Sequence, residues 1–249
     1  MSRDPVTVRF LGSGDAFGSG GRLQSCILVD SLEDRFLIDC GETALIGLKR
    51  FGLDSSVVGT IFISHLHGDH YGGLPFLIKE IQVSGGREEP LVIAGPRGLE
   101  SHVEELMPLI FPGPENPRSV FWPEFLVIPP GEPIRVGRLR VTAYPAAHSA
   151  MSNPLSLRIE CSGRVIAYSG DTEWNDFLPK ASEGADLFIC ETFEYRREAG
   201  NHLDLLTLLE HRHELGCRRI ILTHLGESML ERCGSIEFEC AQDGLYIEL

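Results

Sequence analysis

Three histidines and one aspartate lie within six positions of the sequence, directly after the apolar run "TIFIS". They are His65, His67, Asp69 and His70, in the pattern HxHxDH. In an extended segment, His65 and His67 point the same way because side chains alternate with a period of two. A turn at Gly68 then lets Asp69 and His70 reach a second point nearby. The spacing favours two metal ions, which in two-metal hydrolytic sites lie about 3.5–4 Å apart.

Other apolar runs also end in side chains that can bind a metal. "LRVTAYPAA" ends at His148, "RVIAYSG" at Asp171 and "RIILT" at His224. Strand ends that converge at one edge are the usual place for α/β active sites. A lone histidine at a strand end is more often a hydrogen-bonded structural residue, but beside the HxHxDH cluster these three become candidate ligands. Asp171 suits a bridge between two ions because a carboxylate has two oxygens to share.

The elements that must position these groups alternate along the chain. Short runs rich in Val, Ile and Phe predict strands, and longer amphipathic segments predict helices, so the class is α/β. Strands are predicted over 6–12, 25–30, 35–41, 60–65, 90–95, 125–131, 133–137, 139–149, 155–163, 164–172, 185–193, 219–226, 235–240 and 244–249. Helices are predicted over 42–52, 96–111 and 203–216, and within 71–85 after its glycines. The proline-rich segment 111–124 is predicted as a loop.

The composition limits the partners that the chain can have. Its 249 residues carry a formal net charge of −14, and no Lys/Arg run is longer than a pair. Proteins that bind polyanions usually show a basic excess or stripe, so long nucleic acid is disfavoured and a small-molecule substrate is expected.

The sequence also indicates the cellular compartment in which we expect the protein. No apolar run approaches the ~18 residues of a membrane helix, and the first residues lack the apolar core of a secretory signal. The seven cysteines are widely spaced and form no CxxC pair. They are typical of reduced thiols, so we expect a cytoplasmic protein without a membrane partner.

"HLHGDH", followed by His148, "SGDT" and "ILTHLG", resembles the metallo-β-lactamase superfamily. The resemblance spans nearly the whole chain. It implies a four-layer αββα sandwich with two mixed β-sheets and a dinuclear site at one edge, and we expect a single domain over 1–249. "FLGSGDAF", "IDCGE" and His202, which lies 22 residues before His224, are similar to the ribonuclease Z branch.

The resemblance assigns roles to the candidate residues. It implies one ion on His65, His67 and His148, and a second ion on Asp69, His70 and His224, with Asp171 bridging both. Asp39 would brace the HxHxDH loop from outside the ligand set. Asp69, Asp171 and His202 would serve catalysis. Zinc is expected, with manganese as the alternative, because imidazole and carboxylate ligands suit both metals.

The chain also departs from the ribonuclease Z pattern. That branch carries a long tRNA-gripping arm, commonly between the segments of His148 and Asp171, which here lie only 23 residues apart. Leu203 stands where the pattern has Glu after the catalytic His. The outline is similar to the armless cyclic phosphodiesterases of the carbon–phosphorus lyase pathway. Those carry clustered cysteines near the N-terminus, whereas Cys26 stands alone here.

These features predict a dinuclear hydrolase, in the first place a phosphodiesterase on small phosphodiesters or cyclic nucleotides. His202 would donate a proton to the leaving oxygen, or it would be a helix-end residue without chemistry. The alternatives are a thioester, lactone or sulfate-ester hydrolase, a ribonuclease Z-like endoribonuclease, and a non-catalytic metal-holding protein. A homodimer is possible by the same resemblance.

Several residues remain with two interpretations. Arg196 and Arg197 share the loop of His202 and could bind a phosphate or form a solvated charge pair. Phe121 and Trp122 could cover a base or pack in the core. His102, His211 and His213 fall in predicted helices, and we expect them at the surface.

Overall fold

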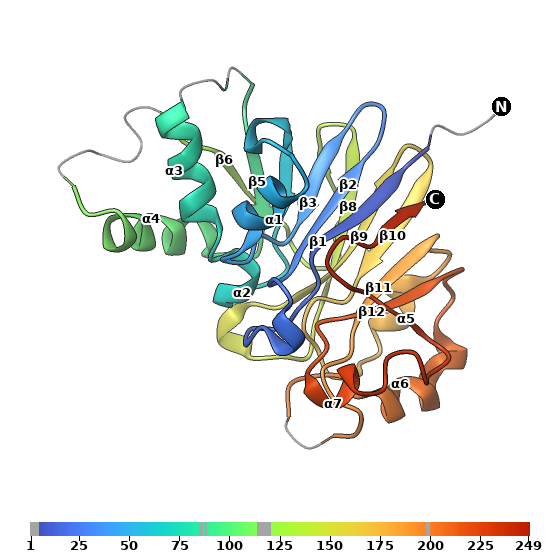
Figure 1. Ribbon diagram of the computed structural model, residues 1–249. Coiled ribbons are helices and arrows are strands. Elements are labelled where there is room, and N and C mark those ends of the chain that lie inside the picture. Colours follow the sequence, from blue (N-terminus) through green and yellow to red (C-terminus); the bar gives the residue numbers. More distant parts are fainter. Residues whose placement is uncertain (1–4, 85–86, 88, 114–120, 198–199) are drawn as a thin grey trace.

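Two seven-stranded sheets form the centre of the molecule in the computed structural model (Figure 1). The structure describes residues 5–84, 87, 89–113, 121–197 and 200–249. One apolar cluster contains Phe10, Phe36 and Phe62 from the first sheet together with Ile159 and Ile189 from the second. The two sheets therefore share a single core between them.

The first sheet has the strand order β14-β1-β2-β3-β4-β5-β6. Strands β3 to β6 run parallel, whereas β14, β1, β2 and β3 pair antiparallel. The last strand of the chain thus returns to pair with the first. The strands are β1 Thr7–Gly12, β2 Cys26–Asp30, β3 Arg35–Ile38, β4 Thr60–Phe62, β5 Val92–Gly95, β6 Glu124–Val127 and β14 Tyr246–Glu248.

The second sheet has the order β13-β12-β11-β10-β9-β8-β7. Strands β7 to β10 pair antiparallel, and β10 to β13 pair parallel. Both sheets are mixed, as predicted. The strands are β7 Ile134–Val136, β8 Leu139–Pro145, β9 Leu155–Cys161, β10 Arg164–Tyr168, β11 Leu187–Glu191, β12 Ile220–Thr223 and β13 Glu239–Cys240.

Helices cover the outer face of each sheet, α1, α3 and α4 on one side and α5, α6 and α7 on the other (Figure 1). The α-helices are α1 Ala44–Arg50, α2 Gly68–Tyr71, α3 Leu74–Ser84, α4 Leu99–Ile110, α5 Leu178–Ser182, α6 Leu205–His211 and α7 Glu227–Leu230. Short 3₁₀ turns occupy Ser19–Gly21, Ser55–Val57, Ala150–Ser152 and Arg212–Glu214. The prediction of a four-layer αββα sandwich is confirmed.

The four layers explain why many strands read as continuous apolar runs. In β3, Phe36 and Ile38 face the core between the sheets, while Leu37 packs under the outer helices. In β12, Ile221 faces the inner core and Leu222 the outer one. Strands buried on both faces lose the apolar–polar alternation of a half-exposed sheet.

Many predicted elements are a few residues longer than the observed ones, and three of the differences are instructive. The helix predicted over 203–216 ends at His211 and continues only as a 3₁₀ turn; its start is fixed by Asp204, whose carboxylate accepts from the Thr207 amide at 3.0 Å. The helix predicted over 96–111 begins at Leu99, after Gly98 with a φ of 92°. The predicted loop 111–124 already enters β6 at its last residue, and its part over 114–120 lies outside the described residues. Within the described part of the chain, no helix is long and apolar enough to cross a membrane.

Candidate metal centre

Four strands of the two sheets deliver the predicted ligands to one place. His65 follows β4, His148 follows β8, Asp171 follows β10 and His224 follows β12, while helix α2 carries Asp69 and His70. The structure brings all seven predicted ligands together in two groups that share Asp171, and within each group the ligand atoms lie within 4.8 Å of one another. We call them the three-histidine group (His65, His67, His148, Asp171) and the buried group (Asp69, His70, Asp171, His224).

In the three-histidine group, ring nitrogens point at one another. His67 Nδ1 lies 3.2 Å from His65 Nε2 and 3.1 Å from His148 Nε2. An oxygen of Asp171 lies 3.6 Å from the same nitrogen of His65. His65 is buried, whereas His67 and His148 are only half-buried. This group therefore faces outward on one side.

Hydrogen bonds behind the rings fix the tautomers of two of these histidines. The Ser64 hydroxyl donates to Asp39 at 2.9 Å, so it accepts from His65 Nδ1 at 3.0 Å. His148 Nδ1 donates to the carbonyl of Asn201 at 2.5 Å. In the neutral imidazole the remaining nitrogen carries no proton, so the two Nε2 atoms turn lone pairs toward His67.

The buried group contains two carboxylates and two imidazoles. His70 Nε2 lies 3.1 Å from Asp69 and 3.3 Å from Asp171. His224 Nε2 lies 3.2 Å from Asp69 and 3.5 Å from Asp171. All four side chains are buried. On its other side, His70 Nδ1 donates to Asp39 at 2.6 Å, so Asp39 braces the ring as the resemblance implies.

The buried carboxylates of the centre need positive charge beside them, as the pKa shifts of the surrounding groups indicate. Burial lowers the pKa of His65 well below its ordinary value, and the His70 imidazole adds to that effect. Burial opposes the charged form of Asp171 as well, but the imidazoles of His224 and His70 hold its pKa well below the usual range. Burial would also lower the pKa of His224, yet Asp171 and Asp69 raise that pKa to about 9. Without a cation, protons on imidazoles must balance the carboxylates.

Divalent cations fit this set of donors. His70 Nε2 and Asp171 Oδ1 are buried and have no hydrogen-bond partner in the described residues. Buried polar atoms are rarely left unpaired, and here they belong to the two groups of donors that meet at Asp171. Because the donors are imidazole nitrogens and carboxylate oxygens without thiolate, they suit zinc or manganese. The seven residues could hold such ions as the resemblance assigns them.

His202 lies beside both groups without joining either. Its ring stacks on His224 with centroids 5.4 Å apart and meets His148 edge-on at 4.9 Å. Its Nδ1 lies 3.0 Å from Oε1 of the buried Glu191. Burial opposes its charged form, but the hydrogen bond to Glu191 raises the pKa of His202. Burial of the Glu191 carboxyl raises its own pKa.

The sequence prediction missed Glu191, whose carboxylate lies beside His202 at the centre. It ends β11, at the same edge as the strands that deliver the ligands. The signal was present, because "LFICE" is another buried run that ends in a carboxylate. Glu191 also accepts from the amide of Thr172 at 2.6 Å, directly after Asp171. It therefore connects His202 to the segment of the shared carboxylate.

The arginines and aromatic residues for which the sequence left two interpretations mostly have the structural role. Arg197 pairs with Glu173 at 2.9 Å on the surface, and the Arg196 guanidinium lies 5.7 Å from the ring centroid of Tyr195. Phe121 and Trp122 pack against the apolar cluster under α3 and α4. The three remaining histidines lie outside the centre: His102 and His213 are exposed, and His211 is half-buried and stacks on Trp174 at 4.4 Å.

Known proteins resemble this chain over almost its whole length. A ribonuclease Z from Methanothermobacter thermautotrophicus is 28% identical, over 88% of this chain and 86% of that protein. The metallo-β-lactamase fold protein YhfI from Bacillus subtilis superposes with a TM-score of 0.78 at 22% identity, over 99% of this chain and 100% of that one. A diphosphatase from the PhnP family superposes with a TM-score of 0.77 at 18% identity, over 98% of each chain.

A family model described as Anti-Pycsar protein Apyc1 matches residues 6–240. Together with the fold and the cluster of histidines and aspartates at its edge, this match fixes the relationship. The chain therefore belongs to the Anti-Pycsar protein Apyc1 family, and it is a hydrolase of the metallo-β-lactamase superfamily from its ribonuclease Z-like branch.

Proposed function

We propose that this hydrolase is a phosphodiesterase that uses two zinc ions, or two manganese ions, on small phosphodiesters or cyclic nucleotides. The observation that carries the proposal is the sharing of Asp171 by the two donor groups. When bound, a pair of divalent cations activates water as a nucleophile and neutralises charge on the phosphoryl oxygens. The relatives named ribonuclease Z and the structural similarity to a diphosphatase support chemistry at phosphorus.

The chain's own residues would position the ions and manage a proton. His65, His67 and His148 would hold one ion, Asp69, His70 and His224 the other, and Asp171 both. Glu191 accepts from His202 Nδ1, which leaves Nε2 of His202 free to face a substrate. From there a protonated imidazole can supply a proton to a departing alkoxide.

A small substrate agrees with the surroundings of the centre. Between His148 and Asp171 the chain forms only a 3₁₀ turn and the β9–β10 hairpin. No arm for a large partner occupies that connection, all of which the structure describes. The net charge of −14 also opposes binding of long polyanions.

Three model substrates test the proposal against the other hydrolase classes. We expect the purified protein, loaded with zinc or manganese, to cleave bis(p-nitrophenyl) phosphate in preference to a p-nitrophenyl carboxylate ester or a lactone. Preferred cleavage of the ester or the lactone would move the protein to another reaction class. No cleavage of any substrate by protein that holds two metal ions would favour a non-catalytic role.

An endoribonuclease activity is the second candidate, because the ribonuclease Z from Methanothermobacter thermautotrophicus aligns over 86% of its own length. Incubation with a precursor tRNA at physiological salt separates the two. Our proposal predicts no site-specific 3′ trimming, and efficient trimming would restore the ribonuclease interpretation.

The proposal extends to the assembly and compartment. We propose a single domain over 1–249 that acts in the cytoplasm, and a homodimer, as the family resemblance implies. The shared core between the two sheets supports one domain. Sedimentation equilibrium measures the assembly directly, and a monomer mass at all concentrations would reject the dimer.

A further inference from the structure

A tyrosine hydroxyl lies buried in the apolar core between the two sheets. Tyr168 is the last residue of β10, and its side chain has no exposed surface. The residue belongs to the inner apolar cluster together with Phe10 and Phe62 of the first sheet. A buried hydroxyl without a hydrogen-bond partner destabilises a fold, so phenylalanine would be the simpler residue at this place. The partners of the hydroxyl therefore decide its role.

The hydroxyl contacts two polar residues of the first sheet. It lies 3.3 Å from Oγ of Ser25, the residue before β2, and it hydrogen-bonds the carboxylate of Asp39, the residue after β3. Because an ionised carboxylate only accepts, Tyr168 donates to Asp39 and accepts from Ser25. Burial and the Asp39 carboxylate raise the pKa of Tyr168 well above its ordinary value. The phenol therefore keeps its proton and remains a donor.

Asp39 supports one histidine of each donor group. Its carboxylate accepts from His70 Nδ1 at 2.6 Å in the buried group. It also accepts from the Ser64 hydroxyl at 2.9 Å, and this hydroxyl accepts from His65 Nδ1 of the three-histidine group. The backbone of Asp39 has a φ of 59°, in the left-handed region. Such a conformation persists where surrounding contacts hold it, and Tyr168 supplies one of these contacts from the second sheet.

Both donor groups combine ligands from the two sheets. His65 follows β4 of the first sheet and His70 lies on the next helix, α2, whereas Asp171 and His224 follow β10 and β12 of the second sheet. The distances between ligands therefore depend on how the sheets are placed against each other. Apolar packing is non-directional, whereas a hydrogen bond requires a distance and an angle. A hydrogen bond across the core can thus specify a placement that apolar contacts leave less defined.

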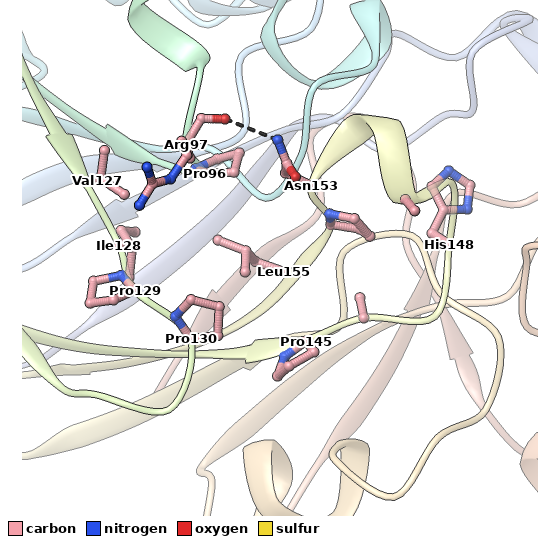
Figure 2. A pocket seen from close by; sticks show the side chains of 13 residues that line it. Pro96, Arg97, Val127, Ile128, Pro129, Pro130, Pro145, His148, Asn153 and Leu155 are labelled. Atoms are coloured by element: carbon pink, nitrogen blue, oxygen red, sulfur yellow. Dashed lines mark hydrogen bonds between the residues drawn. The ribbon is translucent and has the colours of Figure 1, made fainter.

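Tyr168 is also close to the shared carboxylate along the chain, since Asp171 lies three residues after it. Between them, Gly170 packs so closely that a Cβ there would lie 2.6 Å from the carbonyl oxygen of Leu155. Figure 2 shows Leu155 in the wall of a cavity of about 470 Å³ that His148 also lines. Because the turn is packed in this way, a shift of Tyr168 would be passed on to Asp171.

We propose that Tyr168 is a positioning residue of the metal centre, whose hydroxyl holds the Asp39 carboxylate against His70 and so fixes the ligands of the first sheet relative to those of the second. Ser25 supports this hydroxyl from behind. The inference rests on the proposal that the two donor groups bind divalent cations, and it adds a residue that is not itself a ligand.

Tyr168→Phe removes the hydroxyl and keeps the ring. We expect the variant to fold and to bind both ions, but the buried group should bind its ion about 10-fold more weakly, at the lower end of the range for residues that support metal ligands. The three-histidine group should lose less, because Asp39 reaches His65 only through Ser64. Competition with a chelator of known affinity measures both ions, and circular dichroism checks the fold.

Tyr144→Phe is the matched control. Tyr144 lies near the end of β8, four residues before His148, much as Tyr168 precedes Asp171. It is half-buried, and its hydroxyl forms no hydrogen bond with the described residues. The control should leave both metal affinities unchanged. Ser25→Ala should act in the same direction as Tyr168→Phe but less strongly, because Tyr168 can still donate to Asp39.

A double-mutant cycle with Asp39→Asn tests whether Tyr168 acts through Asp39. If it does, the losses of affinity do not multiply, and the double variant should bind the ion of the buried group no more weakly than Asp39→Asn alone. Losses that multiply would overturn the inference. The same holds for a Tyr168→Phe protein that is less stable but keeps the wild-type affinity for both ions, because that result shows a purely structural role.

Unfolding of the metal-free protein separates this inference from the proposed function. In EDTA, the unfolding equilibrium constants of the wild type, the two single variants and the double variant should again show losses that do not multiply, because the contact between Tyr168 and Asp39 needs no ion. If the wild type binds two ions and Tyr168→Phe binds them equally well, the inference is wrong and the dinuclear proposal stands. If the wild type does not bind two ions, the dinuclear proposal fails, and the unfolding cycle decides whether Tyr168 holds Asp39.

Discussion

The three-histidine group and the buried group share Asp171 but differ in chemistry and in access to solvent. The buried group adds a second carboxylate, Asp69, and all of its side chains are buried. The three-histidine group has three imidazoles, two of them half-buried, and its His148 also lines a cavity of about 470 Å³ beside the centre. Greater negative charge at low dielectric strengthens the attraction for a cation. The buried group should therefore hold its ion more tightly, while the three-histidine group is the side that a substrate reaches.

Removal of the shared carboxylate should abolish the difference between the groups. We expect Asp171→Ala to lose both ions and to lose more activity than the 10–100-fold that is typical for residues outside the ligand shell. Metal content by mass spectrometry and kcat/KM on bis(p-nitrophenyl) phosphate measure the effect. Asp176→Ala, at an exposed position five residues further on, is the control and should retain two ions. A wild-type protein that holds at most one ion under metal-replete conditions would contradict the dinuclear proposal.

The next largest effect should come from His202, which contacts a ring of each group. We expect His202→Ala to keep both ions and to lose about 10²–10⁴-fold in kcat on a substrate with an alkyl leaving group. With p-nitrophenolate, which leaves without a proton, the loss should be much smaller. Glu191→Gln should show the same dependence on the leaving group to a lesser degree, because it removes only the charge that supports the imidazole.

The leaving-group dependence decides what His202 does. Equal losses on both substrates would reject proton donation. Loss of metal from His202→Ala would instead make the residue a ligand or a support of one, consistent with its place beside Glu191 and His224 in a third possible group.

The residues behind the two groups allow each group to be weakened to a different degree, because Asp39 contacts His70 directly and His65 only through Ser64. Asp39→Asn keeps the shape but removes the charge that meets His70 Nδ1, so the buried group should lose about 10–100-fold in affinity for its ion. Ser64→Ala removes the acceptor of His65 Nδ1 and should act first on the three-histidine group. Titration with a competing chelator resolves the two ions. An equal loss of affinity for both ions in Asp39→Asn would contradict this order, because it would mean that Asp39 acts on His65 through Ser64 as strongly as it acts on His70.

Most of the ligands could be predicted from the sequence because His65, His148, Asp171 and His224 each follow a strand, and local patterns locate strand ends well. Side-chain alternation places His65 and His67 together, and the parallel strands β10, β11 and β12 bring Asp171 and His224 to one edge. The order of the layers came from the resemblance to a family, since the pairing of β14 with β1 is invisible to a local pattern.

What the sequence did not reveal depends on contacts between distant segments. The role of Glu191 depends on its hydrogen bond to His202, and the spacing of residues in the sequence does not predict that the two side chains meet. The cavity beside His148 is formed by the ends of β5 and β6 together with the segment 145–155, and only the fold brings these segments together. The helix after Asp204 is shorter than predicted because it ends at His211, where the backbone tightens into a 3₁₀ turn over Arg212–Glu214.

The smallest effect should be that of Arg197, which lies outside both groups. Its guanidinium pairs with Glu173 at 2.9 Å, with 62% of the Arg197 side chain exposed, and such surface pairs contribute about 0–1 kcal/mol. Glu173 also accepts from the amide of Asn201 at 2.8 Å, and the Asn201 carbonyl accepts from His148. Arg197→Ala should therefore leave kcat/KM unchanged and change the free energy of unfolding by no more than about 1 kcal/mol. Glu173→Ala should instead loosen His148 and lower the affinity of the three-histidine group for its ion. Denaturant unfolding and chelator titration of the two variants test this order. A larger loss of kcat/KM in Arg197→Ala than in Glu173→Ala would mean that the arginine contacts the substrate phosphate after all.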